Sequence, residues 1–160
     1  MLDGPLRITV PGHPAPKGSL KCIGARGGRG HVLIEDNKRT KGWRETIAHY
    51  ATRSPAAGPG QPLSADVVFT LPRPRSHYGT GRNANTLKPN APTHPVSHAT
   101  GDLDKLLRLV LDALQDAKVI PDDCAVVEAH TRKVYPCQDP QDPGGVRPWP
   151  GVVITLSPAT

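Results

Sequence analysis

The chain has 160 residues, a net charge of +6, 19 prolines, 16 glycines and only 4% aromatic residues. This length suits one domain with a modest core, and the prolines and glycines predict long loops. No run of about eighteen apolar residues is present, which excludes a membrane-spanning helix. The first residues lack the features of a secretory signal, so we expect a cytoplasmic protein.

In chain order, the first half of the sequence predicts three strands and one helix. Alternation of apolar and polar residues indicates strands over 5–12 and 63–72, and a short apolar run indicates another over 31–36. Asn37 is a suitable cap for a helix over 38–53, whose apolar face is formed by Trp43, Ile47 and Tyr50. Residues 13–30, rich in Pro, Gly, Lys and Arg, are predicted to be a loop.

The second half predicts the clearest helix, over 102–118, because apolar side chains recur on one face of it. That face comprises Leu103, Leu106, Leu107, Val110 and Leu114. Strands are predicted over 124–136 and 151–158. The elements together predict a single α+β domain over residues 1–160, with one mixed β-sheet and two main helices packed on it.

The charges are unevenly distributed along the chain. Nine of the 14 acidic residues lie between Asp102 and Asp142, whereas no acidic residue occurs between Val67 and Gly101. A basic chain with such segregation favours a nucleic-acid partner. The Pro/Gly-rich basic segment 73–101 has no apolar periodicity, and it is either a basic arm that contacts the nucleic acid or an inert insertion.

The acidic segment contains two pairs of aspartates that could bind a metal ion. If the chain is extended at Asp102 and Asp104, the two carboxylates point the same way and offer the oxygen ligands that Mg²⁺ prefers. Asp122 and Asp123 follow the helix, and they join the first pair only if the next strand packs beside the start of the helix. Alternatively, Asp102 caps the helix, Asp104 complements its dipole, and the second pair forms a turn.

The stretch "GDLDKLLRLVLDALQDAKVIPDD" (101–123) resembles the signature of RusA-type Holliday junction resolvases, endodeoxyribonucleases often carried by phages and prophages. Asp102 and Asp104 match the first acidic pair of that signature, "LDAL" matches its middle, and Asp122 with Asp123 match the closing pair. Arg108 stands where the family often has a catalytic lysine. The segment "VPGHPAPKGS" (10–19) is similar to the opening of the family and contains Lys17.

The resemblance implies a RusA-like fold and a homodimer that makes paired, Mg²⁺-dependent nicks in four-way or other branched DNA, with Mn²⁺ as an alternative metal. It implies that Asp102, Asp104 and Asp123 (or Asp122) bind the metal and that Arg108 contacts the scissile phosphate. The basic side chains that we expect to contact DNA are Lys17, Lys21, Arg73, Arg75, Arg82, Lys88 and Lys105. Asp112 and Asp116, on the outer helix face, are expected only to make the helix soluble, and Leu109 beside them is a weak indication of a dimer contact.

Two other functions are compatible with parts of the sequence. A non-catalytic module that binds junctions or other nucleic acids would use the basic residues alone and would bind in EDTA without cutting. A sugar-nucleotide transferase also uses an Asp-x-Asp pair to hold Mg²⁺, but it normally needs a larger nucleotide-binding domain. Incubation of a four-way junction with and without Mg²⁺ separates these possibilities from a nuclease.

Overall fold

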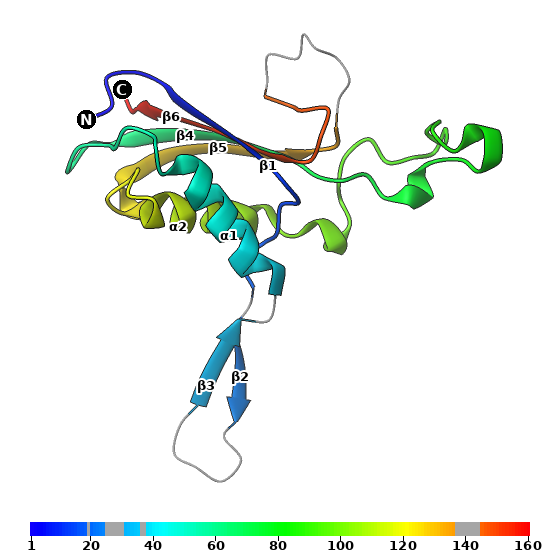
Figure 1. Ribbon diagram of the computed structural model, residues 1–160, viewed down its shortest axis with the longest axis horizontal. Coiled ribbons are helices and arrows are strands. Elements are labelled where there is room, and N and C mark those ends of the chain that lie inside the picture. The colour runs from blue at the N-terminus through cyan, green and yellow to red at the C-terminus, as the bar shows by residue number, and fades with distance from the viewer. Residues whose placement is uncertain (19, 25–30, 36–37, 137–144) are drawn as a thin grey trace.

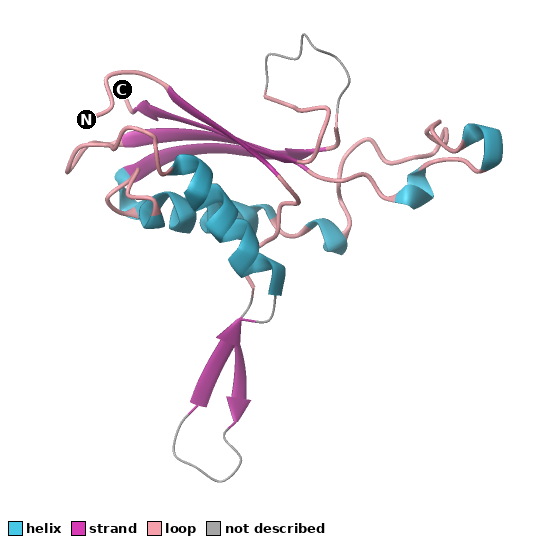
Figure 2. Cartoon of the chain, in the orientation of Figure 1, coloured by secondary structure: helices cyan, strands magenta, loops and turns pink. Residues whose placement is uncertain are grey.

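Four strands form one mixed sheet that carries both long helices on the same face (Figures 1 and 2). The computed structural model describes residues 1–18, 20–24, 31–35, 38–136 and 145–160. The strand order is β1-β6-β4-β5; β4 and β5 are parallel and the other neighbours are antiparallel. The strands are β1 (Leu6–Pro11), β4 (Leu63–Thr70), β5 (Val126–Val134) and β6 (Gly151–Pro158). The predicted α+β fold with a mixed sheet is confirmed.

The alternation in the strands determines which side chains enter the core. Because neighbouring residues of a strand point to opposite faces, every second residue of β4 and β6 faces the helices. These residues are Leu63, Ala65, Val67 and Phe69 in β4 and Val152, Ile154 and Leu156 in β6, and all are buried. They form one core cluster with residues of helices α1 (Lys38–Ala51) and α2 (Leu103–Asp116).

Helix α2 buries a wider face than its sequence pattern predicts. Leu106, Val110 and Leu114 are buried as expected, but Leu109, expected to face outward, is only 1% exposed. Leu109 enters the core because α2 packs against both the sheet and α1. The prediction that Leu109 contributes to a dimer contact is therefore wrong.

Helix α1 has the predicted place but a different apolar face. Trp43 and Ile47 are buried as expected, whereas Tyr50 is 48% exposed and Ala51 is buried in its place. The helix ends at Ala51 rather than at residue 53, and the proposed cap Asn37 lies outside the described residues. Near the start of the helix, Thr40 Oγ1 donates a hydrogen bond to the carbonyl of Pro16 at 2.9 Å.

A second, two-stranded sheet is formed by β2 (Leu20–Gly24) and β3 (His31–Glu35), which pair antiparallel. The strand predicted over 31–36 is confirmed at His31–Glu35, but it lies in this second sheet and not in the main one. The prediction of a loop over 20–24 is wrong, because these residues form β2. β2 is only five residues long and lies in a stretch rich in glycine and basic residues, so its apolar residues give a weak pattern. The hairpin projects away from the helices (Figure 1), and among the described residues its two strands pair only with each other.

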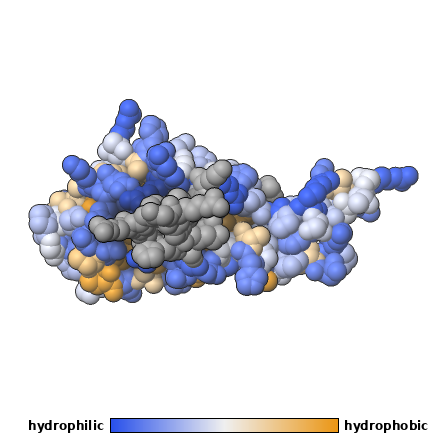
Figure 3. Space-filling view, turned by 90° about the horizontal axis from the view of Figure 1, so that it is seen from below, coloured by the Kyte–Doolittle hydropathy of each residue, from blue (hydrophilic) through white to orange (hydrophobic). Residues whose placement is uncertain are grey.

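The basic segment after β4 is an arm with internal backbone hydrogen bonds. It projects beyond the end of the sheet (Figure 1), and its surface is mainly hydrophilic (Figure 3). The backbone N–H of Gly79 donates to the carbonyl of Thr86 at 3.0 Å, and that of Lys88 donates to the carbonyl of His77 at 2.9 Å. Short 3-10 helices complete it at Arg75–His77, Gly81–Asn83 and His98–Thr100. Local hydrogen bonds, and not an apolar periodicity, therefore give the segment its shape.

The arm and α2 connect the parallel strands β4 and β5, and this crossover sets the direction of α2. Because β4 and β5 run the same way, the helix between them runs back along the sheet. The start of α2 therefore lies at the end of β5, where Lys133 Nζ contacts the carbonyl of Gly101 at 2.8 Å. The end of α2 lies at the start of β5. No helix in the described ranges is long and apolar enough to cross a membrane.

Candidate functional site

Two carboxylates are exposed at the first residues of α2. Gly101, with φ 78° and ψ 160°, adopts a backbone conformation that only glycine adopts readily. Asp102 occupies the N-cap position, but its side chain makes no capping hydrogen bond and is 62% exposed. Asp104 is exposed in the first turn. Asp102 is thus at the predicted cap position but does not cap the helix through its side chain, so no backbone N–H of the helix occupies its carboxylate oxygens.

Positive side chains surround this acidic pair. Lys105 Nζ lies 3.1 Å from Asp102 Oδ2. Arg108 is exposed one turn after Asp104, and across the described part of the chain no ion pair involves it. The third cation, Lys133, reaches the start of α2 from the end of β5. The site thus combines carboxylate oxygens, which are of the kind that could hold a metal ion, with cationic groups of the kind that bind phosphate.

Sequence reasoning missed Lys133, although a signal for it exists. The register pairs Phe69 of β4 with Lys133 of β5, and Phe69 faces the helices. A parallel crossover also returns the end of the second strand to the start of the connecting helix. Had the strands been recognised as parallel neighbours, Lys133 would have been predicted at the site.

The second acidic pair lies at the opposite end of α2. The 14-residue helix is about 21 Å long, and Asp122 and Asp123 follow its end. Asp122 Oδ1 accepts a hydrogen bond from the backbone N–H of Cys124 at 3.0 Å, and this bond lowers the pKa of Asp122. The hydrogen bond between Asp122 and the thiol raises the pKa of Cys124. Among the residues with described positions, no three His, Cys, Asp or Glu side chains gather as a metal site. One chain therefore does not bring the two pairs together.

A protein-family model matches most of the chain. The family model for endodeoxyribonuclease RusA matches residues 11–141. The chain belongs to the RusA endodeoxyribonuclease family. The match begins at the last residue of β1 and covers both helices, the arm and both acidic pairs. Membership implies nuclease activity on branched DNA. No curated protein matches the chain.

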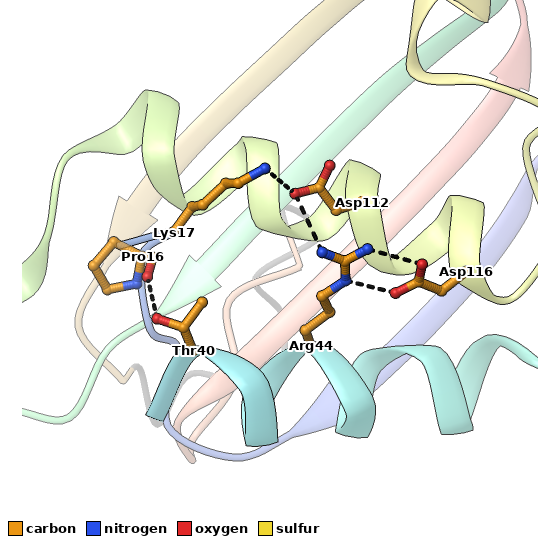
Figure 4. Close-up of polar contacts among 6 residues, drawn as sticks. All are labelled: Pro16, Lys17, Thr40, Arg44, Asp112 and Asp116. Carbon is orange, nitrogen blue, oxygen red and sulfur yellow. Dashed lines mark hydrogen bonds and ion pairs between the residues drawn. The ribbon is translucent and has the colours of Figure 1, made fainter. Parts of the chain in front are cut away.

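In this RusA-family chain, Lys17 and two of the aspartates form contacts between elements (Figure 4). Lys17 Nζ donates to Asp112 Oδ2 at 2.7 Å. Arg44 of α1 donates to both carboxylate oxygens of Asp116, at 2.5 and 2.8 Å. The expectation that Asp112 and Asp116 only make α2 soluble is wrong, because both join α2 to neighbouring elements. The ammonium of Lys17 is directed to Asp112 rather than to the site.

The predicted DNA contacts in the arm fall into two groups. Arg73 lies over the Tyr135 ring, 4.1 Å from its centroid, and Arg75 Nη1 donates to the carbonyl of Ala84 at 2.6 Å. These two arginines therefore help to hold the arm in shape. Arg82 and Lys88 are exposed, and no hydrogen bond, ion pair or ring contact joins their side chains to another described residue. The side chain of Lys21 lies outside the described residues.

Proposed function

We propose that this protein is a divalent-metal-dependent endonuclease that resolves four-way DNA junctions in recombination and repair, acting as a homodimer in the cytoplasm. The observation that carries the proposal is the exposed pair Asp102 and Asp104, whose carboxylates are free of capping bonds and lie among basic side chains. Two exposed carboxylates fit Mg²⁺, which keeps several waters and takes phosphate oxygens as further ligands. Mn²⁺ accepts the same ligands.

Each residue of the site would have its own role in phosphodiester cleavage. Asp102 and Asp104 would hold the metal, which when bound activates water and stabilises negative charge on the phosphate. Arg108 would place two N–H donors on the non-bridging phosphate oxygens. Since arginine does not release its proton near neutral pH, Arg108 acts here by charge and not as an acid. Lys105 pairs with Asp102 and would keep that carboxylate in place.

The arm would hold DNA by its phosphates. Between Val67 and Gly101 the chain has no acidic residue, so its positive charges have no local acidic partners in sequence. The exposed side chains of Arg82 and Lys88 are the best candidates for phosphate contacts. Such contacts release counterions and make affinity strongly dependent on salt.

A dimer is favoured by the apolar flank where α2 meets the edge of the sheet. Three leucines at four-residue spacing on this flank are only partly buried: Leu103, Leu107 and Leu111. The other flank of α2 faces α1, where Asp112 and Asp116 pair with Arg44. β5 is the edge strand on this side. Its Val127 is 65% exposed. A second copy packed along this flank would cover apolar side chains and an open strand edge.

The same dimer would complete the metal site. A two-fold axis perpendicular to α2 and near its middle would make the two copies of the helix run antiparallel. The end of one helix would then lie beside the start of the other. The partner subunit's Asp123 would then join Asp102 and Asp104. This arrangement reconciles the three-carboxylate site implied by the family with the separation of the two pairs in one chain.

The activity is tested with a labelled four-way junction and matched linear duplex, incubated with protein in Mg²⁺, Mn²⁺ or EDTA. We expect paired nicks in the junction with either metal, none in EDTA, and none in the duplex. Binding without cleavage under every condition would reject the nuclease and favour a junction-binding module. Neither binding nor cleavage would reject both.

The shared site is tested by mixing two inactive variants, Asp104→Asn and Asp123→Asn, under conditions that exchange subunits. If the site is shared, each mixed dimer has one intact site, formed by Asp104 of one subunit and Asp123 of the other, and single nicks reappear. If each site is formed within one chain, the mixture stays inactive. Each variant alone is the control.

A further inference from the structure

Lys133 is fixed at the start of α2 by two hydrogen bonds to neutral oxygen atoms. It lies near the end of β5 on the face that carries the helices, and it is partly buried. Its Nζ donates to Thr100 Oγ1 at 3.0 Å and to the carbonyl of Gly101 at 2.8 Å. Both acceptors directly precede Asp102, so the ammonium adjoins the acidic pair.

The acceptors of Lys133 leave its positive charge without a carboxylate partner. Within the described ranges, no Asp or Glu oxygen pairs with its Nζ, and Asp102 pairs instead with Lys105. A lysine has three N–H donors, and two are used. Because a partly buried ammonium without a counterion is costly, this arrangement favours an anion as the third partner.

The backbone around these contacts is held from other sides as well. A Cβ at Gly101 would lie 3.0 Å from Pro16 Cγ, so the loop after β1 packs closely on Gly101. The backbone N–H of Lys17 donates to the carbonyl of Lys105 at 3.1 Å. Lys133 is thus positioned before any ligand arrives, which is the arrangement that makes a charge effective on a phosphate.

We propose that Lys133 binds a non-bridging phosphate oxygen of the DNA strand held at Asp102 and Asp104. The inference rests on the proposed nuclease function and adds a substrate contact from β5 to those on α2. A phosphate suits the position because an ammonium binds it as a point charge and because no carboxylate of the described residues pairs with Lys133. The alternative is that Lys133 only ties the end of the arm to the sheet.

The two roles differ in whether the charge or the hydrogen bonds matter, so three variants test them. Lys133→Met removes both, Lys133→Arg keeps the charge, and Arg53→Met removes one exposed charge after the far end of α1. Junction affinity is measured in EDTA over a series of KCl concentrations. We expect the salt slope to fall by about 1 in Lys133→Met only.

Cleavage of saturating junction in Mg²⁺ is the second readout. Lys133→Met should lower kcat by about a hundredfold, and Lys133→Arg should recover most of the loss. An unchanged salt slope and kcat in Lys133→Met, with a lowered melting temperature, would make the residue structural only. An equal fall of the slope in Arg53→Met would also overturn the inference. A wild type that neither binds nor cuts would instead reject the proposed function itself.

Discussion

Lys17 Nζ and Asp112 Oδ2 are 2.7 Å apart and join the loop after β1 to the middle of α2. The contact is partly buried, since the side chains are 32% and 17% exposed, and Arg44 Nη1 lies 3.8 Å from the same carboxylate oxygen. The loop that packs on Gly101 is therefore held to α2 by the side chain of Lys17, a residue that was predicted from the sequence to contact DNA. This ion pair stabilises the fold beside the site.

Replacing Asp112 by Asn should lower the free energy of unfolding by about 1–3 kcal/mol, because two positive groups lose their shared carboxylate. Urea unfolding at neutral pH measures the change. Glu45→Gln is the control: its pair with Lys41 is exposed and 3.9 Å long, so the change should stay within about 0.5 kcal/mol. Equal effects in the two variants would contradict a structural role for Asp112.

The pair of Arg44 and Asp116 should give stability that depends on pH. The hydrogen bond from Arg44 lowers the pKa of Asp116 below its ordinary value of 3.8. A lowered carboxyl pKa adds stability above the pKa of the unfolded chain, and this stability is lost as the pH falls through the lowered value. Wild type should thus exceed Asp116→Asn in unfolding free energy at pH 6, and the difference should shrink below about pH 4. A difference that grows in acid would refute this assignment.

Gly101→Ala should damage the site more than the fold. The substitution opposes a positive φ of 78° and places a Cβ 3.0 Å from Pro16, which together cost about 1–3 kcal/mol. Displacement of the first residues of α2 should also reduce cleavage. In Gly42→Ala the new Cβ meets no atom within 4 Å inside α1, so this control should gain about 0.5–1 kcal/mol. Thermal unfolding and a cleavage assay of both variants provide the comparison.

The arm should contact DNA through Arg82 and Lys88 rather than Arg75. The double variant Arg82→Met, Lys88→Met should reduce the salt slope of junction binding by about 2 and leave the melting temperature unchanged. Arg75→Met loses a hydrogen bond within the arm, so its main effect should be on the sensitivity of the arm to proteolysis. If the double variant keeps the full slope, the arm is an inert insertion.

Asp104→Asn should abolish cleavage and preserve or tighten junction binding, because it removes a metal ligand together with a charge that repels phosphate. Gel-shift and cleavage assays on the same preparation measure both. Asp66→Asn removes a carboxylate from β4 that pairs with His130 at 3.1 Å, and it is the matched control, expected to retain cleavage. Loss of binding in Asp104→Asn would point to a role in folding instead.

Local pattern was sufficient for much of this protein. All four strands of the main sheet were predicted, two of them (5–12 and 63–72) from alternation. The apolar spacing of Leu106, Val110 and Leu114 predicted α2, because burial of one face imposes a period on the sequence. The two acidic pairs and the RusA resemblance could also be identified from the sequence alone. None of these predictions required knowledge of which elements are neighbours.

The tertiary structure decided the relations between distant elements. Pairing of β4 with β5 in parallel makes α2 run back along the sheet, which separates Asp123 from Asp102 and brings Lys133 to the site instead. The loop after β1 and helix α1 both pack on α2. As a result Asp112 pairs with Lys17 and Asp116 pairs with Arg44. A periodic pattern says which face of an element is buried, but not which element covers it or in which direction that element runs; those are properties of packing and connection.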